Sequence, residues 1–310
     1  MAVPITGNVS GSVFNWSNSN TSIGLGASGT GNIPSFTASN PSLDPVTATI
    51  TVSPEYTNAG TSCTGTEGVF LIQVNPAGDV TQPANQTICH NAQTLAVDFS
   101  TSNTGGSTTY AWTNDTPGIG LPASGNGNII PFTAINNGLS PVTATIIVTP
   151  TYVNGGTSCP GTTKSFTITV NPTAQVTQPA NVVVCNTATS AAITFTTTNT
   201  GGTNSYSWTN SDPTIGLAAS GNGNLPSFTA VNAGTSPITS TITITPSFTH
   251  QSVTCTGPSK SFTITVNPSA QVNQPGNQVV CNTFSTTTVT FGTISTGGTT
   301  TYTWNNDTPA

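Results

Sequence analysis

The 310-residue sequence has very few charged side chains: two Lys or Arg and eight Asp or Glu, which together make up 3 % of the chain. It contains no arginine at all. Nucleic-acid binding depends on clustered Lys and Arg side chains that neutralise phosphates, so the composition excludes a nucleic-acid-binding protein. The formal net charge of −6 is spread thinly along the chain and indicates no particular partner.

Long apolar runs are missing as well. The longest contain four or five residues, whereas a transmembrane helix needs about 20, so we expect no membrane insertion of this segment. The opening residues, MAVPITGNVS, have neither a basic start nor an apolar core and do not resemble a signal peptide.

The residues that are abundant favour a folded β protein over a disordered one. Thr, Ser, Asn and Gly dominate, but Val, Ile and Phe recur among them in alternation. In the stretch 164–170, for example, Phe166, Ile168 and Val170 alternate with Ser and Thr. Alternation of this kind predicts a strand with one buried and one hydrated face.

A period of 96 residues organises the chain, and 52 of the 96 positions are identical when residues 75–170 are aligned without gaps on 171–266. A unit of this length is too long for a solenoid rung and suits an independent β-sandwich. We therefore predict an elongated array of immunoglobulin-like sandwiches with one recurring tryptophan per copy as a core anchor. The tryptophans are Trp16, Trp112, Trp208 and Trp304. The expected domains are a partial first copy (1–74), complete second and third copies (75–170 and 171–266) and a partial fourth copy (267–310).

Within one copy, period-2 patterns predict strands separated by segments rich in Gly, Asn and Pro. In the second copy these strands are expected near residues 79–88, 94–100, 108–113, 129–134, 142–150 and 163–170.

Six cysteines at two fixed phases of the repeat indicate structural disulfides and an oxidising compartment. They are Cys63, Cys159 and Cys255 at one phase and Cys89, Cys185 and Cys281 at the other. Pairs within a copy, such as Cys89–Cys159, would close loops of about 70 residues, and pairs such as Cys63–Cys89 loops of about 26. Chain-entropy values of about 4.4 and about 3.5 kcal/mol do not choose between them. A third pattern joins neighbouring copies, for example Cys89 to Cys255; we favour the pairs within a copy.

The stretch from Tyr110 to Pro172 resembles the PKD domain family, and more narrowly the PKD-like repeats of large Bacteroidota surface proteins. An aromatic-x-Trp strand (Tyr110–Trp112) precedes a short aromatic-Thr segment and two long Thr/Val strands, and a VNP motif closes the copy. The usual Trp-Asp-Phe-Gly-Asp-Gly signature is replaced by Trp-Thr-Asn-Asp at Trp112–Asp115, so no role of those acids is carried over. The resemblance implies extracellular stalks and adhesins, including gliding-motility adhesins, rather than enzymes.

The repeat also serves as an internal control for catalytic and metal sites, because a site built into the module should recur. His90 is replaced by asparagine in the next two copies, and His250 likewise aligns with asparagines. Among the acids only Asp115 and Asp307 share a phase. One acid per copy is too few for Ca²⁺, and two cysteines without a recurring histidine are too few for Zn²⁺. We expect no metal, no cofactor and no enzymatic activity.

A literal GxGxxG occurs at Gly24–Gly29, but the pattern predicts that a strand rather than a helix follows it, and its spacing is lost in the other copies. A dinucleotide site requires a helix there, so we discard that interpretation.

Our leading hypothesis is a non-enzymatic, extracellular stalk or spacer of a repetitive bacterial surface adhesin or filament. A glycan- or ice-binding module is one alternative, for which an exposed Trp112 would be the best anchor; an accessory array of a polysaccharide-degrading enzyme is another. The expected partners are neighbouring repeats, head-to-tail copies of the same chain in which the partial end copies complement each other, and surface polysaccharide.

Overall fold

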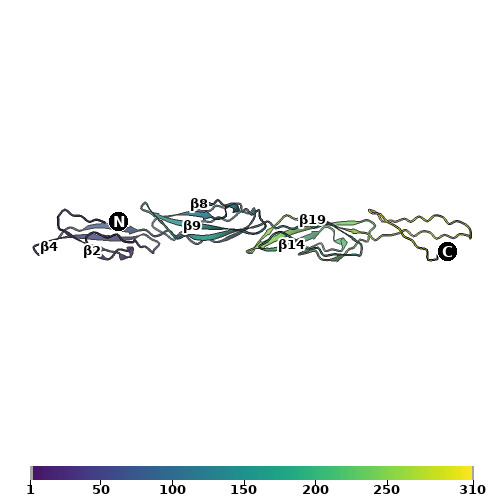
Figure 1. The fold of residues 1–310 in the computed structure, drawn as a ribbon, viewed down its shortest axis with the longest axis horizontal. Helices are drawn as coiled ribbons and strands as arrows, with labels where there is room; N and C mark the ends of the chain where they lie inside the picture. Colours follow the sequence, from purple (N-terminus) through teal and green to yellow (C-terminus); the bar gives the residue numbers. More distant parts are fainter. Residues whose placement is uncertain (1–2, 309–310) are drawn as a thin grey trace. The chain divides into compact units, whose positions relative to one another are not determined.

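A computed structural model of the chain describes residues 3–308 and shows an all-β protein built of tandem β-sandwiches (Figure 1). Its internal contacts define two compact units. The first unit comprises the residues up to 88, 92–135 and 143–169; the second comprises 89–91, 136–142 and 170 onward.

The first copy forms one sheet, in which the long strand β3 is central. Along one edge β3 pairs with β1, which pairs in turn with β2; along the other edge it pairs with β5 and then β4, all antiparallel. The elements are β1 (Val13–Asn18), the 3₁₀ helix η1 (Thr21–Ile23), β2 (Ser28–Thr30), β3 (Val46–Asn58), β4 (Thr61–Thr64) and β5 (Gly68–Val74).

The second copy repeats this sheet and adds one strand to it. The order is β6-β11-β9-β7-β8, with β10 also paired to β9. Strand β6 pairs with β11, whereas β5, the equivalent of β11, has no such partner among residues 3–308. The elements are β6 (Gln86–Cys89), β7 (Ser107–Asn114), η2 (Pro117–Ile119), β8 (Ser124–Asn126), β9 (Val142–Asn154), β10 (Thr157–Pro160) and β11 (Lys164–Asn171).

The third copy has the same sheet, in the order β12-β19-β17-β14-β15, with β18 paired to β17 and a separate pair β13-β16. Strand β12 runs parallel to β19, whereas the other pairs are antiparallel. The elements are β12 (Val182–Cys185), β13 (Thr189–Ser190), β14 (Thr203–Asn210), η3 (Pro213–Ile215), β15 (Ser220–Asn222), β16 (Phe228–Thr229), β17 (Ile238–His250), β18 (Val253–Thr256) and β19 (Lys260–Asn267).

Proline marks the point where β17 changes partner. The pairing with β19 ends at Ile244 and the pairing with β18 begins at Ser247. Pro246 lies between them, where its missing N–H removes no ladder bond, and its carbonyl accepts a hydrogen bond from Gly257. The long strand can therefore hold two successive partners along one edge.

The second layer of each sandwich is thinner than the sequence predicts. The expected strands 94–100 and 129–134 contain only isolated bridges, Val97–Ile129 and Gln93–Thr133. Side chains satisfy backbone donors there in place of a ladder: the Asn128 Oδ1 accepts from Phe99 N at 3.0 Å, and Asn224 does the same for Phe195 at 2.9 Å. The layer still closes the core, because Phe195 and Leu225 pack in one buried cluster with residues of β17 and β19.

Three of the four tryptophans lie in the cores. Trp16, Trp112 and Trp208 are 6 %, 7 % and 4 % exposed. A glycine of the short strand β2, β8 or β15 lies against each indole so closely that a Cβ atom would fall about 2.2–2.3 Å from it. The tight approach explains why glycine stands at the centre of these three strands.

The fourth tryptophan does not behave as the core anchor that we expected. Trp304 is 76 % exposed, and residues 268–308 contain no strand. Val272 at 57 % and Phe284 at 74 % are exposed in the same segment.

Candidate functional site: the junctions between copies

The junctions between successive copies contain contacts that recur with the period of the sequence. In the second unit, the side chain of Asn199 joins three segments: its Nδ2 donates to Leu139 O at 3.3 Å and to Thr173 O at 3.2 Å, and its Oδ1 accepts from Gln175 N at 2.7 Å. Leu139 belongs to the preceding copy and Thr173 to the connecting segment. A side chain that is only 5 % exposed thus satisfies backbone groups on both sides of the junction.

The first unit contains the same arrangement one period earlier. The Nδ2 of Asn103 donates to Leu43 O at 3.3 Å and to Ala77 O at 3.1 Å, and its Oδ1 accepts from Asp79 N at 2.7 Å. Asn103 was not among the residues that we expected to be important, although the second and third copies both have asparagine at this position.

A backbone hydrogen bond and a proline–glycine contact complete each junction. Thr104 N donates to Leu43 O at 3.2 Å, and the equivalent bonds at the next two junctions measure 2.9 and 2.8 Å. Gly105, at φ +71°, lies so close to Pro45 that a Cβ would be 2.8 Å from the proline ring. The equivalents of these two residues are Gly201 with Pro141 and Gly297 with Pro237, at 3.0 and 2.8 Å.

A disulfide links two copies within the second unit. Cys89, in the second copy, is bonded to Cys255, in the third, with 5.6 Å between the Cα atoms and 166 residues between the positions. The bond therefore follows the pattern that joins neighbouring copies and not the Cys89–Cys159 pairing that we favoured. The loop-length energies were too close to distinguish these patterns; the deciding factor is the location of Cys89 at the end of its copy, next to β18.

Hydrogen bonds around this disulfide come from asparagine. Asn171, which is fully buried, donates to the carbonyls of His250 and Val253 at 3.2 Å each. At the preceding junction Asn75 and Asn154 exchange two hydrogen bonds of 3.1 Å. The asparagine of the NP motif therefore holds the β9–β10 or β17–β18 turn near the cysteine.

The other four cysteines, Cys63, Cys159, Cys185 and Cys281, are free thiols in the described residues, and three of them are exposed while Cys159 is partly buried. By the register of Cys89–Cys255, the partner of each would lie in an adjacent copy at a position that residues 3–308 do not contain.

The two histidines and the recurring acid have structural surroundings. The Nδ1 of His90 accepts from Asn136 N at 2.9 Å, and Asn186 accepts from Asn232 N at 2.8 Å in the same way. A histidine and an asparagine thus perform the same acceptor role. His250 is the last residue of β17, and its backbone carbonyl accepts a hydrogen bond from the Nδ2 of Asn171 at 3.2 Å.

Asp115 and the serines at the same position of the other copies also accept the same hydrogen bond. Its Oδ1 accepts from Thr145 N at 2.8 Å, and the hydroxyls of Ser19 and Ser211 accept the equivalent bonds at 2.8 Å. The backbone bond from Thr145, followed by the Thr116 hydroxyl, holds the pKa of Asp115 below its ordinary value. The carboxylate closes a loop in the way that serine does in the other copies.

Neither metal ligation nor dinucleotide binding finds support in the described chain. Residues 3–308 contain no group of three or more His, Cys, Asp or Glu side chains that could hold a metal ion. Gly24 ends η1 at φ +95°, where a Cβ would fall 2.2 Å from Thr37 O, and Gly29 lies against Trp16. The glycines of the GxGxxG match therefore serve a turn and a core contact. None of the short helices in this part of the chain has the length or apolar character needed to cross a bilayer.

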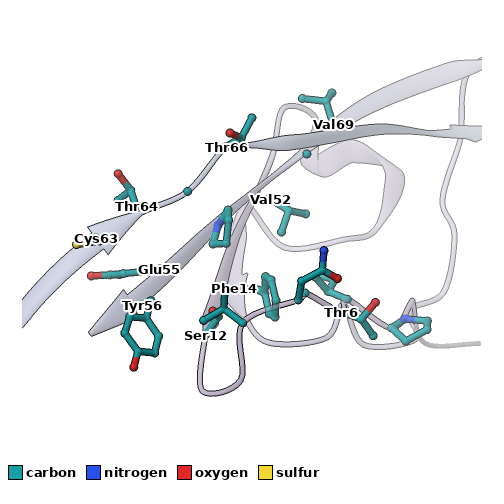
Figure 2. A pocket seen from close by; sticks show the side chains of 18 of the residues that line it. Thr6, Ser12, Phe14, Val52, Glu55, Tyr56, Cys63, Thr64, Thr66 and Val69 are labelled. Carbon is teal, nitrogen blue, oxygen red and sulfur yellow. The ribbon is translucent and has the colours of Figure 1, made fainter. Parts of the chain in front are cut away.

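The described part of the first copy contains an open groove of about 740 Å³, which we call the first-copy groove (Figure 2). It is lined by Phe14, Val52 and Pro54 from the sheet, by Phe70 of β5 and by the segment 3–9. Phe70 is partly buried, whereas its equivalents Phe166 and Phe262 are 2 % exposed each. In the second and third copies the corresponding space is thus covered.

No protein-family model matches the chain, and no curated protein matches it. Among solved structures, the chain is similar to three N-terminal domains of the outer capsid protein Hoc of bacteriophage RB49, with 15 % identity, a TM-score of 0.38 and coverage of 84 % of this chain and 89 % of that one. Mouse cadherin-23 EC22–24 is 12 % identical with a TM-score of 0.34, and the match covers 83 % of this chain and 86 % of that one. Sidekick-1 immunoglobulin domains 1–4 are 10 % identical with a TM-score of 0.33, and the match covers 87 % of this chain and 71 % of that one. At these scores the likenesses do not identify a family.

Proposed function

We propose that the chain is a non-enzymatic spacer segment of a repetitive extracellular protein, in which each 96-residue copy is one PKD-like domain. The observation that supports this most directly is the recurrence of the junctions: the same asparagine, proline–glycine and threonine contacts return at 96-residue intervals. A binding or catalytic site gains nothing from a fixed junction, whereas a spacer depends on it.

The surface chemistry favours an exposed, extracellular position. The only lysines, Lys164 and Lys260, and the absence of arginine leave little for trypsin-like proteases to cleave. Thr, Ser and Asn hydrate the surface without charge, so the segment is insensitive to salt. The disulfide requires an oxidising compartment. Together with the PKD-like motifs of the sequence, these features lead us to propose a bacterial cell-surface location, in an adhesin or filament of the Bacteroidota type.

The glycan- or ice-binding alternative loses its best anchor, because Trp112 is buried and covered by Gly125. Part of the threonine surface is also occupied by its own hydrogen bonds: the hydroxyls of Thr143 and Thr169 lie 2.9 Å apart, as do those of Thr239 and Thr265. These hydroxyls are less free to order a sugar or an ice lattice.

Single-molecule pulling of the chain in reductant tests the spacer proposal. Two equal steps are expected from the second and third copies, each of about 300 Å, because 96 residues stretch to roughly 330 Å and a folded copy spans about 40 Å. Smooth extension without steps would contradict the proposal. A glycan array and an ice-recrystallisation assay, both expected to be negative, test the alternative on the same sample.

A further inference from the structure

A histidine stands at one junction where the next junction has an asparagine. The Nδ1 of His90 accepts a hydrogen bond from Asn136 N at 2.9 Å, and in the third copy the side chain of Asn186 accepts the equivalent bond from Asn232 N at 2.8 Å. Both acceptors directly follow the cysteine that ends β6 or β12. They differ in one property: an imidazole gains a proton between about pH 8 and about pH 5, whereas an amide oxygen does not titrate in this range.

The hydrogen bond to His90 holds the first residue of the loop 136–142. The side chain of Asn136 is 5 % exposed. Its Nδ2 donates to Val170 O at 2.7 Å and to Ser140 O at 2.9 Å, so Asn136 ties the loop both to β11 and to itself. His90 accepts from the backbone N–H of the same residue. The position of the loop therefore depends on an acceptor at His90.

The third copy is bound to this loop. Leu139 O accepts from Thr200 N at 2.9 Å and from the Nδ2 of Asn199 at 3.3 Å. His90 thus acts on the junction through one intermediate: it positions Asn136, and Asn136 positions the loop that presents the Leu139 carbonyl to the third copy.

The segments that hydrogen bonds and the disulfide place around His90 contain no Asp, Glu, Lys or Arg. They are the loop 136–142, residues 170–173 around its backbone partner Asn171, and β18, which the Cys89–Cys255 bond holds beside it. The end of β17 adds one titratable side chain to these described segments, that of His250, whose carbonyl accepts from Asn171. No carboxylate of these segments can therefore compensate a positive charge on His90.

We propose that His90 makes the junction between the second and third copies sensitive to pH. An unprotonated Nδ1 accepts the Asn136 N–H and fixes the loop. A proton on Nδ1 converts the acceptor into a donor, so two N–H groups face each other and the hydrogen bond is lost. Rotation of the ring does not restore the bond, because Nε2 of the imidazolium is also a donor.

The direction of the effect follows from the form in which the imidazole is bound. The folded junction uses the neutral ring, so the stabilisation is present at neutral pH and is lost as acid protonates the ring. Acidification then frees the loop 136–142 and loosens the bonds from Asn199 and Thr200 to Leu139. The disulfide keeps the two copies tethered. The equivalent junction after the third copy does not respond, because Asn186 replaces the histidine there.

Amide hydrogen exchange of the full chain, followed by NMR, tests the proposal. Between about pH 7.5 and about pH 5, the protection factor of the Asn136 amide should fall at least about tenfold, because a donor that loses its acceptor opens more readily. The protection of the Thr200 amide should fall with it. At the higher pH the ring nitrogens of His90 should show a proton on Nε2 and none on Nδ1. A proton on Nδ1 at that pH, or constant protection of Asn136, overturns the proposal.

The repeat supplies matched substitutions that the fold already accommodates. His90→Asn introduces the residue of the third copy and should keep the protection of Asn136 equal at both pH values. Asn186→His is the reverse exchange and should give Asn232 the loss that the wild type shows at Asn136. His250→Asn introduces the residue that stands at this position in the first two copies; it is the control and should behave as the wild type.

The variants separate His90 from every other titratable group. A loss of protection at Asn136 that persists in His90→Asn, or that disappears in His250→Asn, assigns the effect to another group and overturns the proposal. If His90→Asn does not fold, Asn186→His decides, and protection of Asn232 that stays constant with pH overturns it. All these outcomes leave the spacer proposal intact, because that proposal is tested by pulling on single chains at one pH.

Discussion

Tension on the two ends of a chain should pass through the Cys89–Cys255 bond and bypass the residues between them. A disulfide does not break at the forces that unfold sandwiches, so residues 90–254 form a closed ring that carries no load. Most of the second and third copies lies within this ring. In oxidised protein these two copies should therefore contribute almost no extension.

The size of the effect follows from the sequence separation of 166 residues. A fully stretched chain spans about 3.3–3.6 Å per residue, so the ring hides roughly 550–600 Å of contour length. This is about twice the step expected from one copy. Reduction of a single bond should therefore release an extension that current force spectroscopy resolves easily.

The assay compares pulling curves of the same chain with and without dithiothreitol, and of Cys255→Ser without reductant. Reduced protein and Cys255→Ser should both show the two steps of the second and third copies, and oxidised wild type should show neither. Cys63→Ser, which removes a free thiol, serves as the control and should behave as the wild type. Two full steps in oxidised wild-type protein would show that Cys89 and Cys255 are not bonded and would refute the reasoning.

Three further predictions concern stability, each checked by denaturant unfolding. Asn199→Ala should lower the free energy of unfolding by about 2–3 kcal/mol, because Gln175 N and Thr173 O lose their partner and Leu139 O keeps only the bond from Thr200 N; a loss below about 0.5 kcal/mol would contradict its role. Asp115→Ala should cost about 0.5–1 kcal/mol after discounting for solvent exposure. Because the pKa of Asp115 is lowered in the folded state, its contribution is present above the ordinary carboxyl pKa and is lost as the pH falls through the folded pKa; Asp115→Ser should retain the stability without this pH dependence. Gly161→Ala should cost about 1–3 kcal/mol or more, since the new Cβ would lie 1.7 Å from Gly78 O, and Gly118→Ala should cost little.

The sequence predicted the strands of the main sheet well because their alternation is strong. In β9 and β17, 13 residues each, buried apolar or small side chains alternate with Thr, and the same pattern shows in β11 and β19. The strand prediction was wrong where a side chain, and not a neighbouring strand, accepts the backbone hydrogen bond. Residues 94–100 alternate like a strand but contain only an isolated bridge at Val97. The reason is that Phe99 N donates to the side chain of Asn128 and not to a neighbouring strand.

Short strands and 3₁₀ helices were missed for another reason. β8 is Ser-Gly-Asn, a composition typical of turns, and it forms a strand only because Trp112 needs a flat, side-chain-free cover. Its strand character depends on a tertiary contact and cannot be read from local propensity.

The disulfide pattern could not be predicted from spacing, because loop entropy changes slowly with length. The junction asparagines could have been noticed in the sequence, since Asn103 and Asn199 occupy the same position of the 96-residue repeat. Their role required knowing that three backbone segments converge on them, which only the structure supplies.

The bond between adjacent copies has a mechanical consequence for any array that repeats its register. In such an array the force would pass through the bond at Cys255, along the 26 residues from Cys255 to Cys281 (281 − 255), and then through the next disulfide. For every two copies, which contain 192 residues (2 × 96), only these 26 residues would be under tension, and when extended they span about 90 Å. Two folded copies, each as long as a 13-residue strand, span about the same distance. Such an array would be a tether of fixed length: its domains could melt without the tether growing longer, and alternate bonds would form a second, parallel line that holds if the first is cut.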